Sequence, residues 1–250
     1  MEKNPRNLTF LDHLEEFRWR FIWSLVAWAV GCAIIYPWTR QILDALVTPV
    51  GHLVFVSPAE GFLSFITVLA VCGLILASPV IFYELWAFAG EALFPQERKF
   101  VAVFGPMSLF LFVFGAAFCY AFVVPWSMGF FLSFATERLT PMITVGKYIQ
   151  YVAFMCLSFG LVFEMPLLFV FLTQVGIATP EFLIQKRRHA IVAIFVVSAI
   201  LTPPDYVSQI LMAIPLMGLY EISIHLSKWI SRRKQETRLA ENLTCGEARP

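Results

Sequence analysis

Three carboxylates lie among aromatic residues in the stretch Phe82–Lys99, which reads Phe-Tyr-Glu-Leu-Trp-Ala-Phe-Ala-Gly-Glu-Ala-Leu-Phe-Pro-Gln-Glu-Arg-Lys. The acids are Glu84, Glu91 and Glu97, and long apolar runs flank the stretch on both sides. This pattern predicts a short connection at a membrane surface, where aromatic rings are half buried. An anionic lipid surface attracts Lys and Arg rather than acids. The stretch is therefore either a solvated loop with incidental acids or a cradle for a cationic, partly apolar peptide.

A fourth acid, Glu164, lies inside an apolar run and is followed closely by Pro166. An acid at the centre of a membrane helix costs about 3 kcal/mol on insertion scales, so its side chain faces protein or water. Two readings stay open, a hydrogen-bonded or protonated structural residue and the wall of a wet cavity.

A polar cluster is expected near the turn of the last helical pair, from Thr202, Tyr206 and Gln209. Amides and hydroxyls can join helices in lipid. These groups would either bond within the hairpin or dock another subunit.

Sequence signatures of catalysis are absent from the chain. It contains no phosphate-binding Gly-x-x-x-x-Gly-Lys-Ser/Thr, no Gly-x-Ser-x-Gly and no His-Glu-x-x-His. The four His and five Cys residues have no metal-ligand or redox spacing. We therefore expect no enzyme activity, no metal and no cofactor, and the net charge of +1 indicates no general affinity for nucleic acid.

The composition predicts an all-α integral membrane protein, with 59% hydrophobic residues, 14% charged residues and a mean hydropathy of +0.76. One transmembrane domain is expected over residues 1–227, beginning with an amphipathic helix at 8–20, and a charged tail over 228–250. The six spans are expected at about 21–38, 62–83, 100–124, 148–175, 190–202 and 206–224.

Basic residues predict the orientation of these spans. Fifteen of the 18 Lys and Arg residues fall on the side that holds both termini and the Phe82–Lys99 stretch, whereas Arg40, Arg138 and Lys147 fall on the other. This asymmetry places both termini in the cytoplasm. The last two spans are short, because residues 190–202 would make about 20 Å of helix against a hydrocarbon core of ~30 Å. They either pack behind longer helices or leave room for a partner.

Several motifs follow one another along the chain. They are His13-Leu14-Glu15-Glu16-Phe17-Arg18-Trp19-Arg20, residues 78–88, Phe94-Pro95-Gln96-Glu97-Arg98-Lys99, Phe163-Glu164-Met165-Pro166, and Leu201-Thr202-Pro203-Pro204-Asp205 with Gln209. Together they resemble the TatC family, the receptor subunit of the twin-arginine protein translocase. The amphipathic motif departs from the usual family pattern at Phe17, where Leu is common, and at Trp19, where a basic residue is common.

The resemblance implies a concave six-helix bundle in the bacterial inner membrane that binds signal peptides carrying paired arginines. It implies recruitment of the single-span subunits TatA and TatB into a multimeric complex that moves folded proteins with the proton-motive force. Carried onto matching positions, it implies signal-peptide recognition by Glu16, Phe88 and Glu97, a functional intramembrane acid at Glu164, partner docking at Thr202 and Gln209, and outer-loop roles for Pro49 and Asp205.

The physical chemistry of arginine agrees with this reading, because a planar guanidinium matches a carboxylate with two N–H groups and lysine does not. Two charge-assisted contacts give roughly 3–6 kcal/mol, whereas micromolar binding needs about 8 kcal/mol. The apolar segment of the peptide must supply the remainder. The alternative function is a proton-coupled transporter of a small solute using Glu164.

Overall fold

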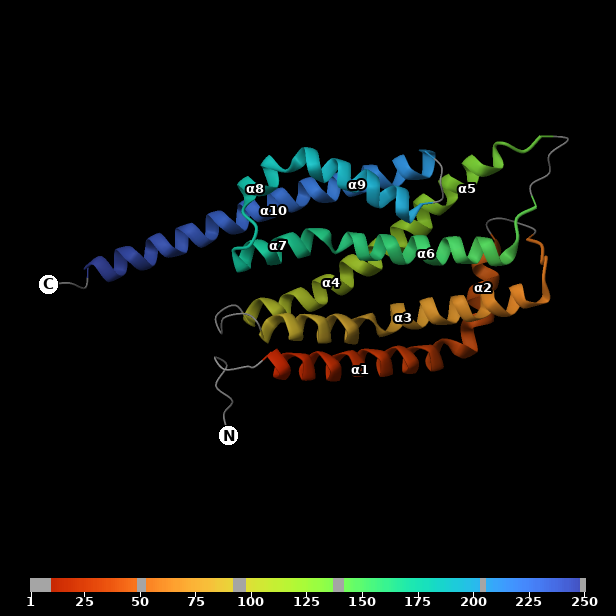
Figure 1. Cartoon of the computed structure of the whole chain (residues 1–250), viewed down its shortest axis with the longest axis horizontal. Helices are drawn as coiled ribbons and strands as arrows, with labels where there is room; N and C mark the ends of the chain where they lie inside the picture. Colours follow the sequence, from red (N-terminus) through yellow and green to blue (C-terminus); the bar gives the residue numbers. More distant parts are fainter. Residues whose placement is uncertain (1–9, 49–52, 92–97, 137–141, 203–205, 248–250) are drawn as a thin grey trace. The chain divides into compact units, whose positions relative to one another are not determined.

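Long apolar runs with few helix breakers make this chain helical almost throughout the part that the structure describes. The structure is a computed structural model, and it describes residues 10–48, 53–91, 98–136, 142–202 and 206–247. Its helices are α1 (Phe10–Ile35), α2 (Thr39–Val47), α3 (Pro58–Glu91), α4 (Arg98–Phe118), α5 (Val124–Leu132), α6 (Val145–Phe163), α7 (Met165–Val175), α8 (Pro180–Gln185), α9 (Arg187–Leu201) and α10 (Tyr206–Glu247) (Figure 1).

Five helical stretches among the described residues are long and apolar enough to cross a membrane. Large apolar side chains on these stretches are exposed, such as Phe21, Phe62 and Phe110. Exposed apolar surface on this scale suits lipid rather than water. The prediction of an all-α membrane protein is confirmed. The five stretches are 14–47, 58–90, 103–132, 145–175 and 206–232.

The N-terminal helix differs from the prediction of a surface helix at 8–20 followed by a separate span at 21–38. Helix α1 runs unbroken from Phe10 to Ile35, because neither Gly nor Pro occurs between Phe10 and Gly31 to interrupt it. It ends in a 3₁₀ turn, Tyr36–Trp38, that contains Pro37. The short helix α2 then follows, where the sequence analysis expected only a connection.

The Phe82–Lys99 stretch is not wholly a connection, which corrects the prediction. Helix α3 has 34 residues and continues to Glu91, and α4 begins at Arg98. The expected end of the span at Tyr83 was wrong because Glu84, Leu85 and Ala87, which follow it, all favour helix. The extension matters for function, because it places Glu84 and Phe88 on a helix rather than on a loop.

Prolines shape the third and fourth expected spans without ending them. A π-helical turn, Cys119–Val123, joins α4 to α5, which has Pro125 in its first turn. Such a turn accommodates the missing proline N–H. In the same way α6 gives way to α7 at Glu164, and Pro166 lies at the start of α7.

Of the last two helices only α9 is short, so the prediction of two short helices was wrong in part. Helix α9 has 15 residues, whereas α10 has 42 and extends through the expected tail. No Gly or Pro interrupts α10 between Gly218 and Gly246, so polarity alone did not end the helix at Ile224.

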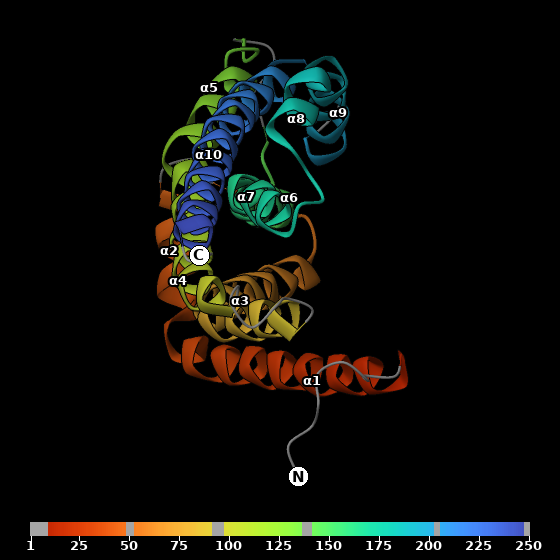
Figure 2. The ribbon, with the colours of Figure 1, turned by 90° about the vertical axis from the view of Figure 1, so that its left-hand side faces the viewer.

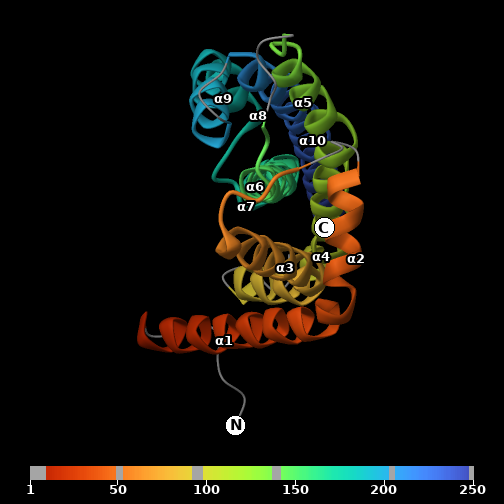
Figure 3. The same cartoon turned by 90° about the vertical axis from the view of Figure 1, so that its right-hand side faces the viewer.

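The chain groups into two compact units, residues 1–113 with 134–157 and residues 114–133 with 158–250. In the first unit, α1 lies along α3 (Figure 1, Figure 3). Trp28 Nε1 donates to the carbonyl of Ala70 at 2.9 Å across this interface. The close approach depends on Gly31 and Gly73, both buried, as small residues commonly allow between membrane helices.

In the second unit, α10 packs beside α7 and α9 (Figure 2). Thr173 and Ser227 share a buried hydrogen bond of 2.9 Å, and Tyr220 Oη donates to the carbonyl of Leu183 at 2.7 Å. These bonds satisfy polar groups that lipid could not.

We predict that Gly31→Ala destabilises the protein by about 1–3 kcal/mol, because a Cβ there would lie 2.5 Å from the carbonyl oxygen of Gly73. Thermal unfolding in detergent measures the change. Gly218→Ala is the matched control, because a Cβ at that position meets nothing within 4 Å. Equal melting temperatures for Gly31→Ala and Gly218→Ala would contradict the close approach.

Candidate functional site

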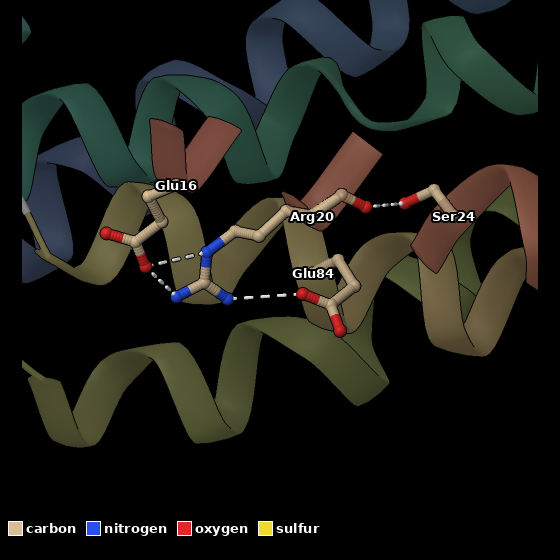
Figure 4. A network of polar contacts seen from close by, with 4 residues as sticks. All are labelled: Glu16, Arg20, Ser24 and Glu84. Carbon is tan, nitrogen blue, oxygen red and sulfur yellow. Dashed lines mark hydrogen bonds and ion pairs between the residues drawn. The ribbon is translucent and has the colours of Figure 1, made fainter. Parts of the chain in front are cut away.

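An ion triad of Glu16, Arg20 and Glu84 joins α1 to α3 (Figure 4). Arg20 Nε donates to Glu16 Oε1 at 3.0 Å, and Arg20 Nη2 donates to the same oxygen. Arg20 Nη1 donates to Glu84 Oε2 at 3.2 Å. One guanidinium therefore bridges carboxylates that are 68 positions apart in the chain.

Helical periodicity brings the first pair together. Glu16 and Arg20 are four residues apart, and side chains at this spacing lie on one face of a helix. Glu84 comes from the extension of α3 beyond the expected span. The triad thus needs both an unbroken α1 and a long α3.

Partial burial strengthens the triad. The side chains of Glu16, Arg20 and Glu84 are 24%, 21% and 19% exposed. The neighbouring pair Arg18–Glu15 is 65% and 63% exposed with its atoms 3.8 Å apart, so solvent screens it and it contributes little. The triad carries two negative charges and one positive, which leaves a net charge of −1 at a partly desolvated site.

An apolar groove of about 430 Å³ borders the triad. Phe17 and Phe88 meet edge-on at its rim, with ring centroids 5.6 Å apart. The groove can take apolar side chains, and the carboxylates beside it can take a guanidinium. The other residues that line it, besides Arg20 and Glu84, are Phe21, Ser24, Leu25, Trp28, Leu74, Ile81 and Leu85.

The structure brings two of the three predicted recognition residues, Glu16 and Phe88, to this one place. Glu97, Pro49 and Asp205 lie outside the described residues. Glu164 is half buried at the junction of α6 and α7, where its carbonyl accepts the N–H of Leu168 at 2.9 Å.

Thr202 and Gln209 bond within their own hairpin. Thr202 is buried, and its Oγ1–H donates a hydrogen bond to the carbonyl of Ser198 at 2.8 Å. Gln209 Nε2 reaches back from α10 to the carbonyl of Phe195 on α9 at 3.1 Å. Of the two readings left open by the sequence, these contacts support the local one.

Arg20 was not predicted as a site residue, and Glu84, although one of the three acids of the possible cradle, was not among the predicted recognition residues. The spacing of Glu16 and Arg20 was a signal that could have found the first pair. No local signal joins Arg20 to Glu84, because their contact depends on how α1 packs on α3.

No group of three or more His, Cys, Asp or Glu side chains in the described part of the chain could hold a metal ion.

A sequence profile of the family described as Sec-independent protein translocase protein (TatC) matches residues 12–215. This match covers most of the 250 residues. The chain belongs to the TatC family.

Curated TatC-family proteins are similar over nearly their whole length. The chain is 38% identical to the Sec-independent protein translocase protein TatC of Carboxydothermus hydrogenoformans over 239 residues, which cover 94% of this chain and 98% of that one. It is also 38% identical to the Aquifex aeolicus protein of the same description over 240 residues, covering 92% and 98%.

A crystal structure described as the twin arginine translocase receptor TatC matches with a TM-score of 0.79 at 37% identity, and the match covers 88% of this chain and 99% of that one. Membership of the TatC family makes this chain a component of a Sec-independent protein translocase in a membrane. The resemblance inferred from the motifs is thereby confirmed.

We predict that Thr202→Val lowers the free energy of unfolding by about 0.5–1.5 kcal/mol, because it removes a buried hydrogen-bond donor without changing shape. Thr48→Val is the matched control, since Thr48 makes the same kind of bond, to the carbonyl of Asp44, at an exposed position. Denaturation in detergent compares the two. If both variants unfold like the parent protein, the hydroxyl of Thr202 has no structural role.

Proposed function

We propose that this TatC-family chain is the receptor for signal peptides that carry paired arginines, with Glu16, Phe88 and Glu97 as the residues that bind them. The observation that carries the proposal is that Glu16 accepts two N–H groups of a guanidinium beside an apolar groove. This is the chemistry that a peptide with arginines next to an apolar segment requires.

The energies of the two parts are complementary. Arginine contacts of about 1.5–3 kcal/mol each do not reach micromolar affinity by themselves. Burying apolar side chains contributes about 25 cal/mol per Å², and the groove lined by Phe17, Trp28 and Phe88 offers such surface directly next to the carboxylates.

In this proposal the protein crosses the inner membrane six times, with both termini and the recognition residues in the cytoplasm. The distribution of Lys and Arg supports this orientation. The crossing that is added to the five long apolar stretches is α9, the fifth in chain order, whose 15 residues make about 22 Å of helix. A helix of this length needs a thinned bilayer or longer neighbours.

The receptor recruits the single-span subunits TatA and TatB, and the passage for a folded cargo forms with them. A folded domain of 100 residues has a radius of gyration of ~13 Å, which is too large for a bundle of helices spaced 8–10 Å apart. The membrane potential, worth ~2.3 kcal/mol per charge per 100 mV, supplies the drive. We keep the hairpin of α9 and α10 as the proposed docking place for a partner, with Thr202 and Gln209 stabilising its shape through their bonds inside it. Glu164 is the proposed intramembrane functional acid.

We predict that Glu16→Gln weakens binding of a synthetic Arg-Arg signal peptide by about 10-fold or more, because it removes a charge-assisted contact worth about 1.5–3 kcal/mol. Fluorescence anisotropy with the full chain in nanodiscs measures the Kd. The matched control is Glu15→Gln, which changes the same charge at an exposed position. Equal effects of both variants would show that general charge attraction, and not a site, holds the peptide.

We also predict that a photoreactive amino acid at position 88 crosslinks to the Arg-Arg peptide and that a Lys-Lys peptide competes poorly for it, since lysine lacks the planar fork. The same amino acid at Phe110, which is 64% exposed on α4, serves as the control. A small-solute transporter would give no crosslink at either position. Equal competition by the two peptides would contradict the proposed specificity.

A further inference from the structure

We propose that Arg20 is a resident competitor of the ligand. In the free receptor it occupies Glu16, and the arriving guanidinium of the peptide displaces it from Glu16 onto Glu84. This inference rests on the proposed function, and it adds a built-in restraint on the affinity of the same site.

Arg20 engages Glu16 through its guanidinium, the group by which the ligand would also bind. Its Nε and Nη2 both donate to Glu16 Oε1 (Figure 4). The ligand carries the same functional group, so its best geometry at this oxygen is already in use. Two guanidinium groups on one carboxylate would also repel each other at a site that is partly shielded from water.

Glu84 is a second carboxylate with which Arg20 can stay paired when it leaves Glu16. Arg20 Nη1 already contacts Glu84 Oε2 at 3.2 Å. Glu84 lies on α3 and Glu16 on α1, so the two acids hold the guanidinium from different helices. Arg20 can leave Glu16 without entering the apolar groove, where an unpaired charge would be costly.

The charges of Glu16, Arg20 and Glu84 do not balance. Arg20 is the only cation within salt-bridge distance of Glu16 or Glu84 among the residues that the structure describes. Two carboxylates and one guanidinium leave one negative charge. A single arriving guanidinium neutralises the group, with one arginine for each carboxylate.

Arg20 lowers the fraction of receptor molecules in which Glu16 is uncovered, and it does not contact the ligand. If Glu16 is uncovered in about one tenth of the molecules, every ligand of Glu16 binds about 10-fold more weakly than it would to an uncovered site. The ratio of Kd values for Arg-Arg and Lys-Lys peptides is then unaffected by Arg20. A residue that contacted the ligand directly would change this ratio.

The test measures the Kd of a fluorescent Arg-Arg peptide and a Lys-Lys peptide for the full chain in nanodiscs. Arg20→Gln should tighten binding of both peptides by about 10-fold and leave their ratio unchanged. The matched control is Arg18→Gln. It removes the same charge two positions from Arg20, and Arg18 belongs to an exposed ion pair with Glu15. It should change the Kd by less than about twofold, because exposed charges are well screened.

A second, independent experiment changes Glu84 and leaves Arg20 unchanged. Glu84→Gln should weaken binding by about threefold or more, because Arg20 loses its carboxylate partner on α3 and stays on Glu16. The same substitution in the Arg20→Gln background should have no effect, which a double-mutant cycle reveals. If Glu84 bound the ligand directly, the loss would persist without Arg20.

Each outcome decides between the two proposals. Failure of the parent protein to bind the Arg-Arg peptide, or equal binding of the Lys-Lys peptide, overturns the proposed function. Discrimination by the parent protein, with Arg20→Gln binding equally or more weakly, overturns the competitor alone. Should Arg20→Gln not fold, Arg20→Lys keeps the charge without the fork and should tighten binding by a smaller factor. Unchanged or weaker binding by Arg20→Lys also overturns the proposal that Arg20 competes with the ligand. Unchanged or tighter binding by Glu84→Gln with Arg20 present does the same.

Discussion

A partly buried arginine that must keep carboxylate partners is the constraint on which the candidate site depends. Arg20 is 21% exposed and lies beside an apolar groove. A guanidinium in such surroundings is stable only when opposite charges and hydrogen bonds replace the water that it has lost. Glu16 and Glu84 provide both, and they do so from two different helices.

This requirement couples the ion triad to the packing of α1 on α3. The two helices approach closely near the end of α1 and the middle of α3, because Gly31 and Gly73 carry no side chains, and Trp28 joins them with a hydrogen bond. Closer to the start of α1, Phe17 and Phe88 close the rim of the groove. Small residues thus set the spacing of the helices, and the spacing decides that one guanidinium can reach both acids.

The rest of the chain follows the rules of a protein dissolved in lipid. Its helices expose large apolar side chains, while hydroxyl groups such as those of Thr173 and Ser227 are buried and paired. Pro125 and Pro166 lie in the first turn of α5 and α7, and a π-helical turn precedes Pro125. A component of a protein translocase needs such a rigid frame, because a recognition site is only as specific as the positions of its carboxylates.

The sequence alone determined the class of the protein, its family and most of its helices. Apolar composition and length of runs depend on local chemistry, so they predicted membrane helices near 62–83, 100–124 and 148–175. Motifs that contain Glu16, Phe88 and Glu164 predicted the family, which the comparison confirmed. The predicted helix ends were less accurate, because nothing in the local sequence ends α3 at Tyr83 or α10 at Ile224. The amphipathic α2 was missed, although Ile42, Leu43 and Leu46 have helical spacing.

Only the tertiary structure decided what these residues do to one another. It placed Arg20 between Glu16 and Glu84 and directed Gln209 to a carbonyl of its own hairpin. The physical reason is that a contact between distant segments depends on the spacing and rotation of packed helices. A sequence pattern records which residues share a face of one helix, but not which carboxylate of a neighbouring helix lies opposite.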